Sequence, residues 1–443
     1  MPDILSKMIS GMSWASFRNA KDLHMRIFFT LGALIVYRIG GYVPLPGVNA
    51  EVVAEIVQRN SGGFLGVLDM FSGGALGRMT LMTLSIAPYI SASIAVQILS
   101  FAIPSLEALR KEGDSGRRKL NQYTRYATVG LAIFQAYVVS VALESIYQAG
   151  VFAVLDPGLV FRISTVVSLV GATLFAMWLG EQINQRGIGN GISLLIYAGI
   201  VANLPQALIK VFALGRVGAI SLLSLLVFLI ASFFFFAFIV FVERANRRIL
   251  IQYPRAQGSQ AQSSYMPLKL NAAGVMPPIL SMAFLGMLLG LLRFIASSFS
   301  LESMSTWLSS LTHGNWAFVT IYALLIIVFS FVYTGIVFNP KETADNLHKN
   351  GGFMAGLRPG SATEQYLSSV VKRLTLFGAI YLVLVCTVPE ILQSKVAMSF
   401  YFGGTGLLIM VSVSMDIVSQ VQAKMFSHQY SALLKKARKK KLI

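Results

Sequence analysis

The feature that most constrains this chain is a series of apolar runs, each close to the length that crosses a lipid bilayer as a helix. A membrane span needs roughly 20 mostly apolar residues. Ten runs approach that length, at residues 27–43, 81–103, 126–149, 163–180, 190–209, 218–242, 273–297, 317–338, 374–392 and 401–423. Of the 443 residues only 12% are charged, against roughly 25% in soluble domains. The sequence therefore predicts an all-α integral membrane protein with ten transmembrane helices.

The basic residues of the connections favour one topology for these spans. Most of the 36 lysines and arginines lie before the first run, in every second connection or in the C-terminal tail. Positively charged connections stay on the cytoplasmic side. We therefore expect both termini to be cytoplasmic, in agreement with an even number of spans, and we interpret the net charge of +18 mainly as a topology signal.

The spans divide into two halves of five, residues 1–210 and 211–443, which would have inverted topologies. The second span carries Pro88 within APYIS, and the corresponding span of the second half opens with Pro277 and Pro278. Interrupted spans at matching positions of inverted repeats indicate the functional site of a transport protein. The alternative is that proline is simply common in membrane helices.

Residues 64–104 depart most clearly from the pattern of plain spans. Phe64 to Phe71 is apolar but ends at Ser72, Gly73 and Gly74, so it is too short to cross a membrane alone. Such a fragment is tolerated at membrane depth only inside protein or beside a water-filled cavity. In the span that follows, with Pro88 near its middle, helical spacing predicts one part-polar face, formed by Ile86, Ile90, Ser93 and Gln97. This stretch predicts a cavity closed by a short segment.

The sequence gives little support for catalysis. It has no phosphate-binding loop of the GxxxxGK[ST] type, no GxSxG turn and no metal-ligand spacing among its four histidines. The glycine-rich stretch 186–191 follows an apolar span rather than a strand, so we interpret it as a turn that lets the next helix begin close to its neighbour. Cys386 is the only cysteine. We expect no enzyme activity, no catalytic residues, no cofactor and no metal.

Several longer motifs, in order along nearly the whole chain, resemble the SecY family. They are YRIGGYVPLPGV (37–48), MFSGGALGR (70–78), APYISASI (87–94), KEGDSGRRKLNQYTRY (111–126), GEQINQRGIGNGIS (180–193), FNPKETADNL (338–347), GLRPG (356–360) and YFGGTGLLI (401–409). The resemblance implies ten helices in two inverted halves around an hourglass pore with a short plug helix, open sideways to lipid. It implies a protein-conducting channel that passes unfolded secretory polypeptides and releases hydrophobic segments sideways into the lipid.

The resemblance also implies particular site residues. The pore ring would consist of Ile86, Ile90, Ile192, Ile196, Ile279 and Ile409, with Met276 beside it. The plug would be 64–78, including Phe64, Leu65, Leu68, Met70, Phe71, Gly73 and Gly74, and the lateral gate would include Ser91 and Gln97. A ring of apolar side chains dewets and blocks ions without binding a sliding chain. Asp69 and Gly77 receive no role.

Two basic loops, 243–270 and 339–373, are the candidate docking surfaces. The charge pattern alone has two explanations. The arginines and lysines could bind an acidic partner such as ribosomal RNA, or they could be there only because positively charged connections stay on the cytoplasmic side. The resemblance assigns docking to Arg244, Arg247, Arg248, Arg255 and Arg358. It implies a heterotrimer with SecE and SecG, the motor ATPase SecA, ribosomes and their RNA, signal sequences, nascent polypeptides and membrane lipid as partners, in the bacterial plasma (inner) membrane.

Two function classes remain at this point. The first is the polypeptide channel, and the second is an ion-coupled secondary solute transporter with inverted repeats. Transporters of that class need ionisable groups inside the membrane, and the apolar runs hold few of them. The broken segment at 64–78 and the basic loops favour the channel.

Overall fold

The computed structural model describes residues 21–59, 69, 72–148, 151–216, 221–253, 262–298, 315–354, 356–395 and 404–440. Within them, each of the ten predicted runs contains one helix. The chain forms two compact units, one of Met1–Arg59, Leu68–Asn203 and Val413–Ile443, the other of Asn60–Val67 and Leu204–Ser412. The two helices α10 (Gly191–Arg216) and α17 (Gly404–Lys440) contribute to both units. The division at residue 210 into inverted halves stays a prediction.

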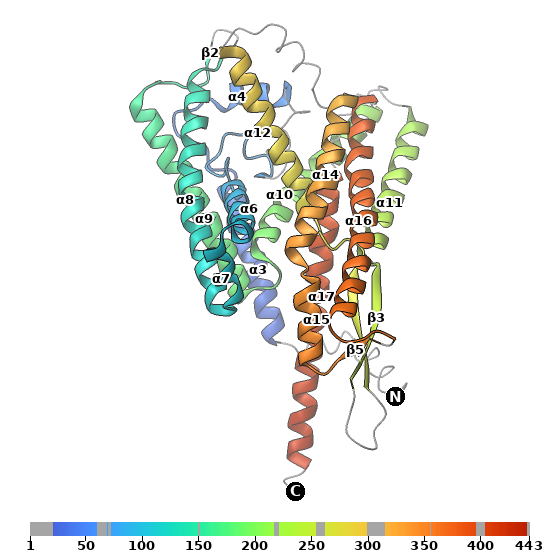
Figure 1. The fold of residues 1–443 in the computed structure, drawn as a ribbon. Coiled ribbons are helices and arrows are strands. Elements are labelled where there is room, and N and C mark those ends of the chain that lie inside the picture. The colour runs from blue at the N-terminus through green and yellow to red at the C-terminus, as the bar shows by residue number, and fades with distance from the viewer. Residues whose placement is uncertain are drawn as a thin grey trace. The chain divides into compact units, whose positions relative to one another are not determined.

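The first unit is a helical bundle with a small amount of β structure. Its other helices are α3 (Lys21–Gly40), α4 (Ala50–Arg59), α6 (Ala87–Ala102), α7 (Pro104–Lys111), α8 (Asp114–Glu144) and α9 (Leu159–Arg186). Helix α8 packs against both α6 and α9, as Figure 1 shows. Between α8 and α9 the strands β1 (Tyr147–Gln148) and β2 (Val151–Phe152) pair antiparallel.

The second predicted span differs from the expectation. Residues 81–86 form turns rather than helix, and α6 begins only at Ala87, so Pro88 lies in the first helical turn and not mid-span. The physical reason is that proline lacks an N–H group, and the first turn of a helix is where no N–H needs an intrahelical acceptor. Helix α12 (Met276–Ser298) repeats this arrangement, with Pro277 and Pro278 in its first turn.

The second unit contains the remaining helices and a three-stranded sheet. The helices are α11 (Leu222–Arg244), α12, α14 (Trp316–Val337), α15 (Pro340–Lys349) and α16 (Ser361–Lys395). Helix α14 lies side by side with α12 and α16 (Figure 1). The strands are β3 (Asn246–Tyr253), β4 (Gln262–Lys269) and β5 (Phe353–Met354), in the order β4-β3-β5, all antiparallel neighbours.

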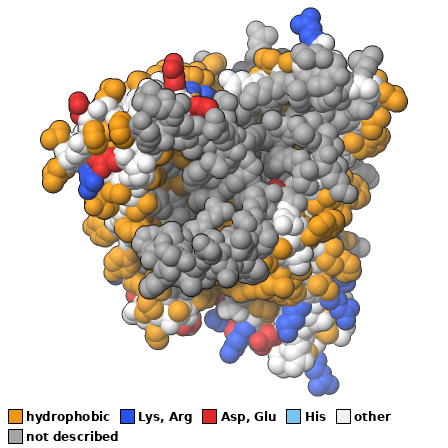
Figure 2. Space-filling view, turned by 90° about the horizontal axis from the view of Figure 1, so that it is seen from above, with side chains coloured by type: hydrophobic (Ala, Val, Ile, Leu, Met, Phe, Trp, Pro, Cys, Tyr) orange, Lys and Arg blue, Asp and Glu red, His pale blue; other side chains and the backbone are white. Residues whose placement is uncertain are grey.

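Helix length and side-chain exposure agree with a multi-pass membrane protein. Among the described residues, six helices are long and apolar enough to cross a membrane, and α6 with α7, bent by 104° at their junction, would be a seventh. Many large apolar side chains are exposed, such as Val160 at 83% and Val167 at 67%. Figure 2 shows hydrophobic side chains recurring over the visible surface, where a soluble protein would present more charge.

Candidate functional site

The first two predicted ring residues lie where the buried turns after the predicted plug give way to α6. Ile86 is 2% exposed and stands at the N-cap of α6, and its carbonyl accepts the Ile90 N–H at 3.0 Å. The two isoleucines are therefore one helical turn apart. Helix α6 has 16 residues, about 24 Å at 1.5 Å each, which is less than the roughly 30 Å of the bilayer core. The rest of this crossing is made by irregular backbone.

That irregular backbone is buried and internally hydrogen-bonded. The side-chain carboxylate of Asp69 accepts the Gly77 N–H at 2.7 Å, and its main-chain carbonyl accepts the Gly74 N–H at 2.8 Å. The Thr83 hydroxyl donates to the Thr80 carbonyl at 2.5 Å. Non-helical backbone is tolerated at membrane depth only when its polar groups are satisfied inside protein or by water. Asp69 and Gly77, which the sequence left without a role, thus close the turn that ends the plug.

Two arginines converge on Gly73, a predicted plug residue. Arg38 donates from Nη1 to the Gly73 carbonyl at 3.2 Å, and Arg78 donates from Nη2 to the same oxygen at 3.0 Å. Both guanidinium groups also lie over the ring of Tyr42, at 5.7 Å and 4.6 Å from its centre. Charge-assisted hydrogen bonds are about twice as strong as neutral ones, so this carbonyl is a fixed point of the plug segment.

Gly73 also makes a close approach to α10. A Cβ atom added at Gly73 would lie 2.8 Å from the Gly199 Cα and 2.3 Å from Arg38 Nη1, and the Gly73 φ is +70°. Only glycine fits both the space and the conformation. In this conformation the structure uses Gly73 for tight packing. The plug residues Phe64, Leu65, Leu68, Met70 and Phe71 lie outside the described residues.

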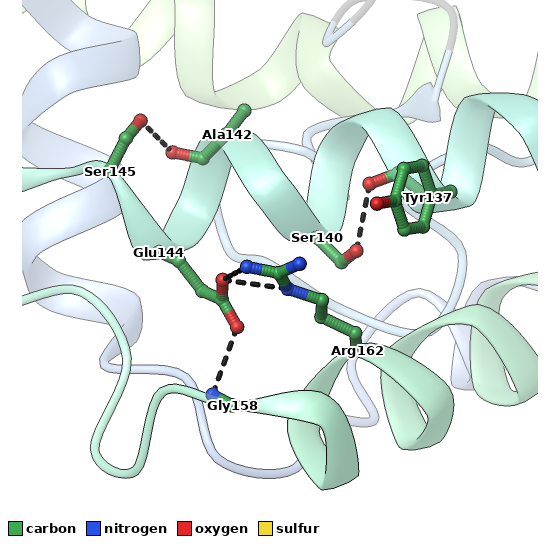
Figure 3. Close-up of polar contacts among 7 residues, drawn as sticks. All are labelled: Tyr137, Ser140, Ala142, Glu144, Ser145, Gly158 and Arg162. Carbon is green, nitrogen blue, oxygen red and sulfur yellow. Dashed lines mark hydrogen bonds and ion pairs between the residues drawn. The ribbon is translucent and has the colours of Figure 1, made fainter.

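A layer of extended segments holds the far end of the plug turn. Pro44 forms an isolated antiparallel β-bridge with Thr80, and Val48 forms one with Val154. Residues 43–49 therefore connect the plug turn to the segment between α8 and α9. That connection is fixed by an ion pair, because Arg162 donates to Glu144 from Nε at 2.8 Å, while Glu144 also accepts the Gly158 N–H at 3.0 Å (Figure 3). No sequence spacing predicts these partners of Glu144, which come 14 and 18 residues later.

The other ring residues of the first unit follow the glycine-rich turn. Ile192 is half-buried in the first turn of α10, and Ile196, one turn later, is 8% exposed. A Cβ atom added at Gly191 would lie 1.9 Å from the Gly180 carbonyl oxygen. This approach confirms that the turn lets α10 begin close to α9.

The amide groups of this turn are occupied by side chains, which leaves them unable to cradle a phosphate group. The pairs are Ile188 N–H to Thr30 Oγ1 at 3.0 Å, Gly189 N–H to Gln420 Oε1 at 2.9 Å, Gly191 N–H to Asn184 Oδ1 at 2.7 Å and Ile192 N–H to Asn190 Oδ1 at 3.1 Å. The turn is therefore a structural device and not a nucleotide loop.

In the second unit the predicted ring residues lie on α12 and α17. Ile279 is half-buried in the first turn of α12, close to Met276, the first residue of that helix. Ile409 is 3% exposed on α17, whose first residue Gly404 would place a Cβ atom 1.9 Å from the Val385 carbonyl oxygen. Each of these helices thus begins at a tightly fixed point.

The start of α12 is tied to the basic hairpin of β3 and β4. The Asn271 side-chain amide, just after β4, donates to Glu243 Oε1 at 2.8 Å and to the Gly274 carbonyl at 3.1 Å. The Tyr381 hydroxyl of α16 also reaches Glu243, at 3.5 Å. The amide that pairs with Glu243 comes 28 residues later, so no local pattern indicates the pair.

The predicted docking arginines lie on this hairpin and near α16. Arg244, Arg247 and Arg248 are exposed, and so is Arg358, while Arg255 lies outside the described residues. Beneath the hairpin is an apolar cluster of Ile249, Ala344, Met354, Leu367, Val370 and Leu374. The hairpin, α15, β5 and the start of α16 therefore form one small folded platform with its arginines outward.

The lateral-gate residues are exposed on α6. Ser91 and Gln97 both face away from the described chain, and Gln97 donates to the Ser93 hydroxyl at 3.2 Å. Among the described residues no group of three or more His, Cys, Asp or Glu side chains could hold a metal ion.

Comparison with known proteins agrees with this architecture. The family model described as SecY matches residues 80–418. The chain is 45% identical over 429 residues to "Protein translocase subunit SecY" of Rickettsia bellii, covering 96% of this chain and 99% of the relative.

Two solved structures share the fold. One is described as "The structure of a protein conducting channel" (TM-score 0.59, 18% identity, 90% of this chain and 92% of that one). The other is "Sec61 in the Canine ribosome-channel complex from the endoplasmic reticulum" (TM-score 0.55, 17% identity, 90% of this chain and 92% of that one). Because the family model matches residues 80–418 and the relative matches over nearly the full length of both chains, the chain belongs to the SecY family.

Proposed function

We propose that this chain is the pore subunit of a protein translocase and conducts unfolded polypeptides through a membrane. The observation that carries the proposal is the largely buried, non-helical backbone of residues 73–86 leading into α6 at Ile86. A chain folded for lipid contact alone would continue this crossing as helix, because every N–H and C=O group must be satisfied there. A segment that closes a pore has a reason to be irregular.

Family membership decides between the two hypotheses in favour of the channel. The relative in Rickettsia bellii is a translocase subunit by name, and the apolar ring residues offer a seal that makes no fixed hydrogen bonds to a passing chain. Hydrophobic segments would leave sideways past α6 according to their transfer energy, about −0.3 to −0.6 kcal/mol for a central leucine and +2.5 to +3.5 for a central arginine. The channel has no catalytic step of its own.

The finer assignments form part of the same proposal. The exposed arginines of the β3–β4 hairpin and Arg358 would dock a ribosome or the motor SecA, and a ribosome accompanies the Sec61 channel of similar fold. SecE and SecG would complete the heterotrimer. The basic connections would lie in the cytoplasm of a bacterial cell, with both termini on that side of the plasma membrane.

Crosslinking tests the pore assignment. In a Cys386→Ala background, a single cysteine replaces Ile90 or Ile192, and a stalled secretory polypeptide is presented to the translocase in vesicles. We expect crosslinks from both positions, because the ring would surround the passing chain. The control is a cysteine at Val167, 67% exposed in the first third of α9, which should stay unlinked. Equal crosslinking at Val167, or none at the ring in a variant that still secretes, would refute the proposal.

A further inference from the structure

The last helix of the chain holds the turn from which the ring helix α10 begins. The Gln420 side-chain oxygen, on α17, accepts the Gly189 N–H at 2.9 Å. Lys424, one turn further along α17, points its ammonium group at the Gly187 carbonyl at 3.5 Å. These contacts join residues more than 230 positions apart in the sequence.

The two contacts suit the chemistry of the turn. Gly187 is the C-cap of α9, and the negative end of a helix dipole favours a nearby cation such as the Lys424 ammonium. Gly189, with a φ of +91°, lies between the end of α9 and the start of α10, so its N–H group is outside both helices and needs an acceptor from elsewhere. Because the lysine contact is long, Gln420 makes the stronger of the two bonds.

Apolar packing fixes α17 in the position from which it reaches the turn. Leu23 and Ile188 form a buried cluster, 4% and 3% exposed, against which Ile27, Ile417, Val421 and Met425 pack. The cluster therefore joins the start of α3, the turn itself and one face of α17. On the other side of the turn, the Thr30 hydroxyl accepts the Ile188 N–H.

We infer that Gln420, supported by Lys424, is a positioning residue for the pore: it holds the 187–190 turn and thereby sets the first turn of α10, which carries Ile192 and Ile196. The turn has no hydrophobic side chain of its own except Ile188, so its geometry depends on side-chain acceptors brought by other helices. Loss of the Gln420 bond lets the start of α10 shift and weakens the ion seal. This inference rests on the proposed function, since it takes Ile192 as part of that seal.

The test compares Gln420→Ala with Gln422→Ala, a glutamine two positions along the same helix for which the described part of the chain shows no side-chain hydrogen bond. Hydrogen exchange of the intact translocase in lipid nanodiscs reads the position of the turn. We expect the Gly189 amide to exchange roughly fivefold faster in Gln420→Ala, as for the loss of one net hydrogen bond, and unchanged in Gln422→Ala. Unchanged exchange in both variants would overturn the inference.

Resting ion conductance in planar bilayers reads the consequence for the pore. We expect a higher conductance for Gln420→Ala than for the wild type or Gln422→Ala, a further rise when Lys424→Met is added, and recovery in Gln420→Glu, which keeps an acceptor oxygen. Faster exchange with unchanged conductance would refute the inference. Ile192→Asn tests the ring assignment separately from the role of Gln420. If Ile192→Asn raises the resting ion conductance and Gln420→Ala does not, only the inference about Gln420 fails. If neither variant raises the conductance, the ring assignment itself is rejected.

Discussion

At the residue scale, glycines and carboxylates at a few positions hold the non-helical backbone in place, where no helix supplies the hydrogen bonds. Gly73 combines a left-handed backbone with contact to Gly199, and Asp69 satisfies an amide that no helix or strand would use. Composition shows that such residues are present, but not which atoms they meet. The acceptor for each amide comes from a segment that only folding brings near.

The packing of Gly73 leads to a prediction with a matched control. Gly113 has a φ of +74°, close to that of Gly73, but nothing lies within 4 Å of an added Cβ atom. Gly113→Ala should lose only the backbone strain of its positive φ, about 1–3 kcal/mol, because its φ of +74° with a ψ of −135° is a conformation that favours glycine. Gly73→Ala should lose more stability and raise the resting ion conductance, because Arg38 and the α10 backbone must move. Thermal unfolding in detergent and bilayer conductance measure both effects, and equal results for the two variants would exclude a tight fit at Gly73.

At the element scale, the β3–β4 hairpin has one set of side chains that would stabilise it and another set that would bind a partner. Its inward side rests on Ile249 and Met354, while Arg247 and Arg248 are exposed. The sequence indicated a basic loop at 243–270 and left open whether topology alone had placed the charges there. In the fold, Arg247 and Arg248 lie on β3, which packs over the apolar cluster, and a strand positions its side chains more precisely than a loop does.

The part of the hairpin arginines in ribosome binding can be measured by comparing two double variants, each of two consecutive arginines. Arg247→Ala with Arg248→Ala should weaken ribosome binding and lower the slope of log affinity against log salt by about 1.4 to 1.8, since each phosphate contact contributes roughly 0.7–0.9. Arg117→Ala with Arg118→Ala, equally exposed on α8, should leave both quantities near the wild type. If both pairs weaken binding alike, the hairpin has no special part in docking.

The same hairpin gives a stability prediction for its core. Ile249 is 7% exposed within the cluster beneath β3. Ile249→Ala should cost about 2–4 kcal/mol of local stability, because it removes buried methyl groups and leaves a cavity. Limited proteolysis at the hairpin should then be faster than in the Arg247→Ala, Arg248→Ala variant. Unaltered cleavage would show that the cluster does not support the hairpin.

At the scale of the whole molecule, the chain is a set of membrane helices, and the contacts that position them are concentrated where helices begin. Helices α6, α10, α12 and α17 carry the predicted ring residues, and each starts at a proline, a side-chain-capped turn or a close glycine contact. A fixed helix start sets the position of the residues in its first turns.

Deletion of residues 64–76 tests the plug at this scale. The deletion removes Gly73 and with it the carbonyl that Arg38 and Arg78 bind. Because the helices that cross the membrane are untouched, the variant should still insert and assemble, but its resting ion conductance should exceed that of the wild type severalfold. Conductance equal to the wild type in a correctly inserted variant would rule out the plug assignment.

The sequence by itself determined the class, the helices and the predicted orientation, because apolar length and the distribution of charge act through the solvent and need no long-range contact. The motifs that resemble the SecY family could also be recognised from the sequence alone. Only the tertiary structure decided that Pro88 opens a helix, that Gly73 packs against Gly199, and that Gln420 caps a turn more than 230 residues away. These depend on which backbone groups are left without partners once the helices have packed, a property of the folded chain and not of any local stretch.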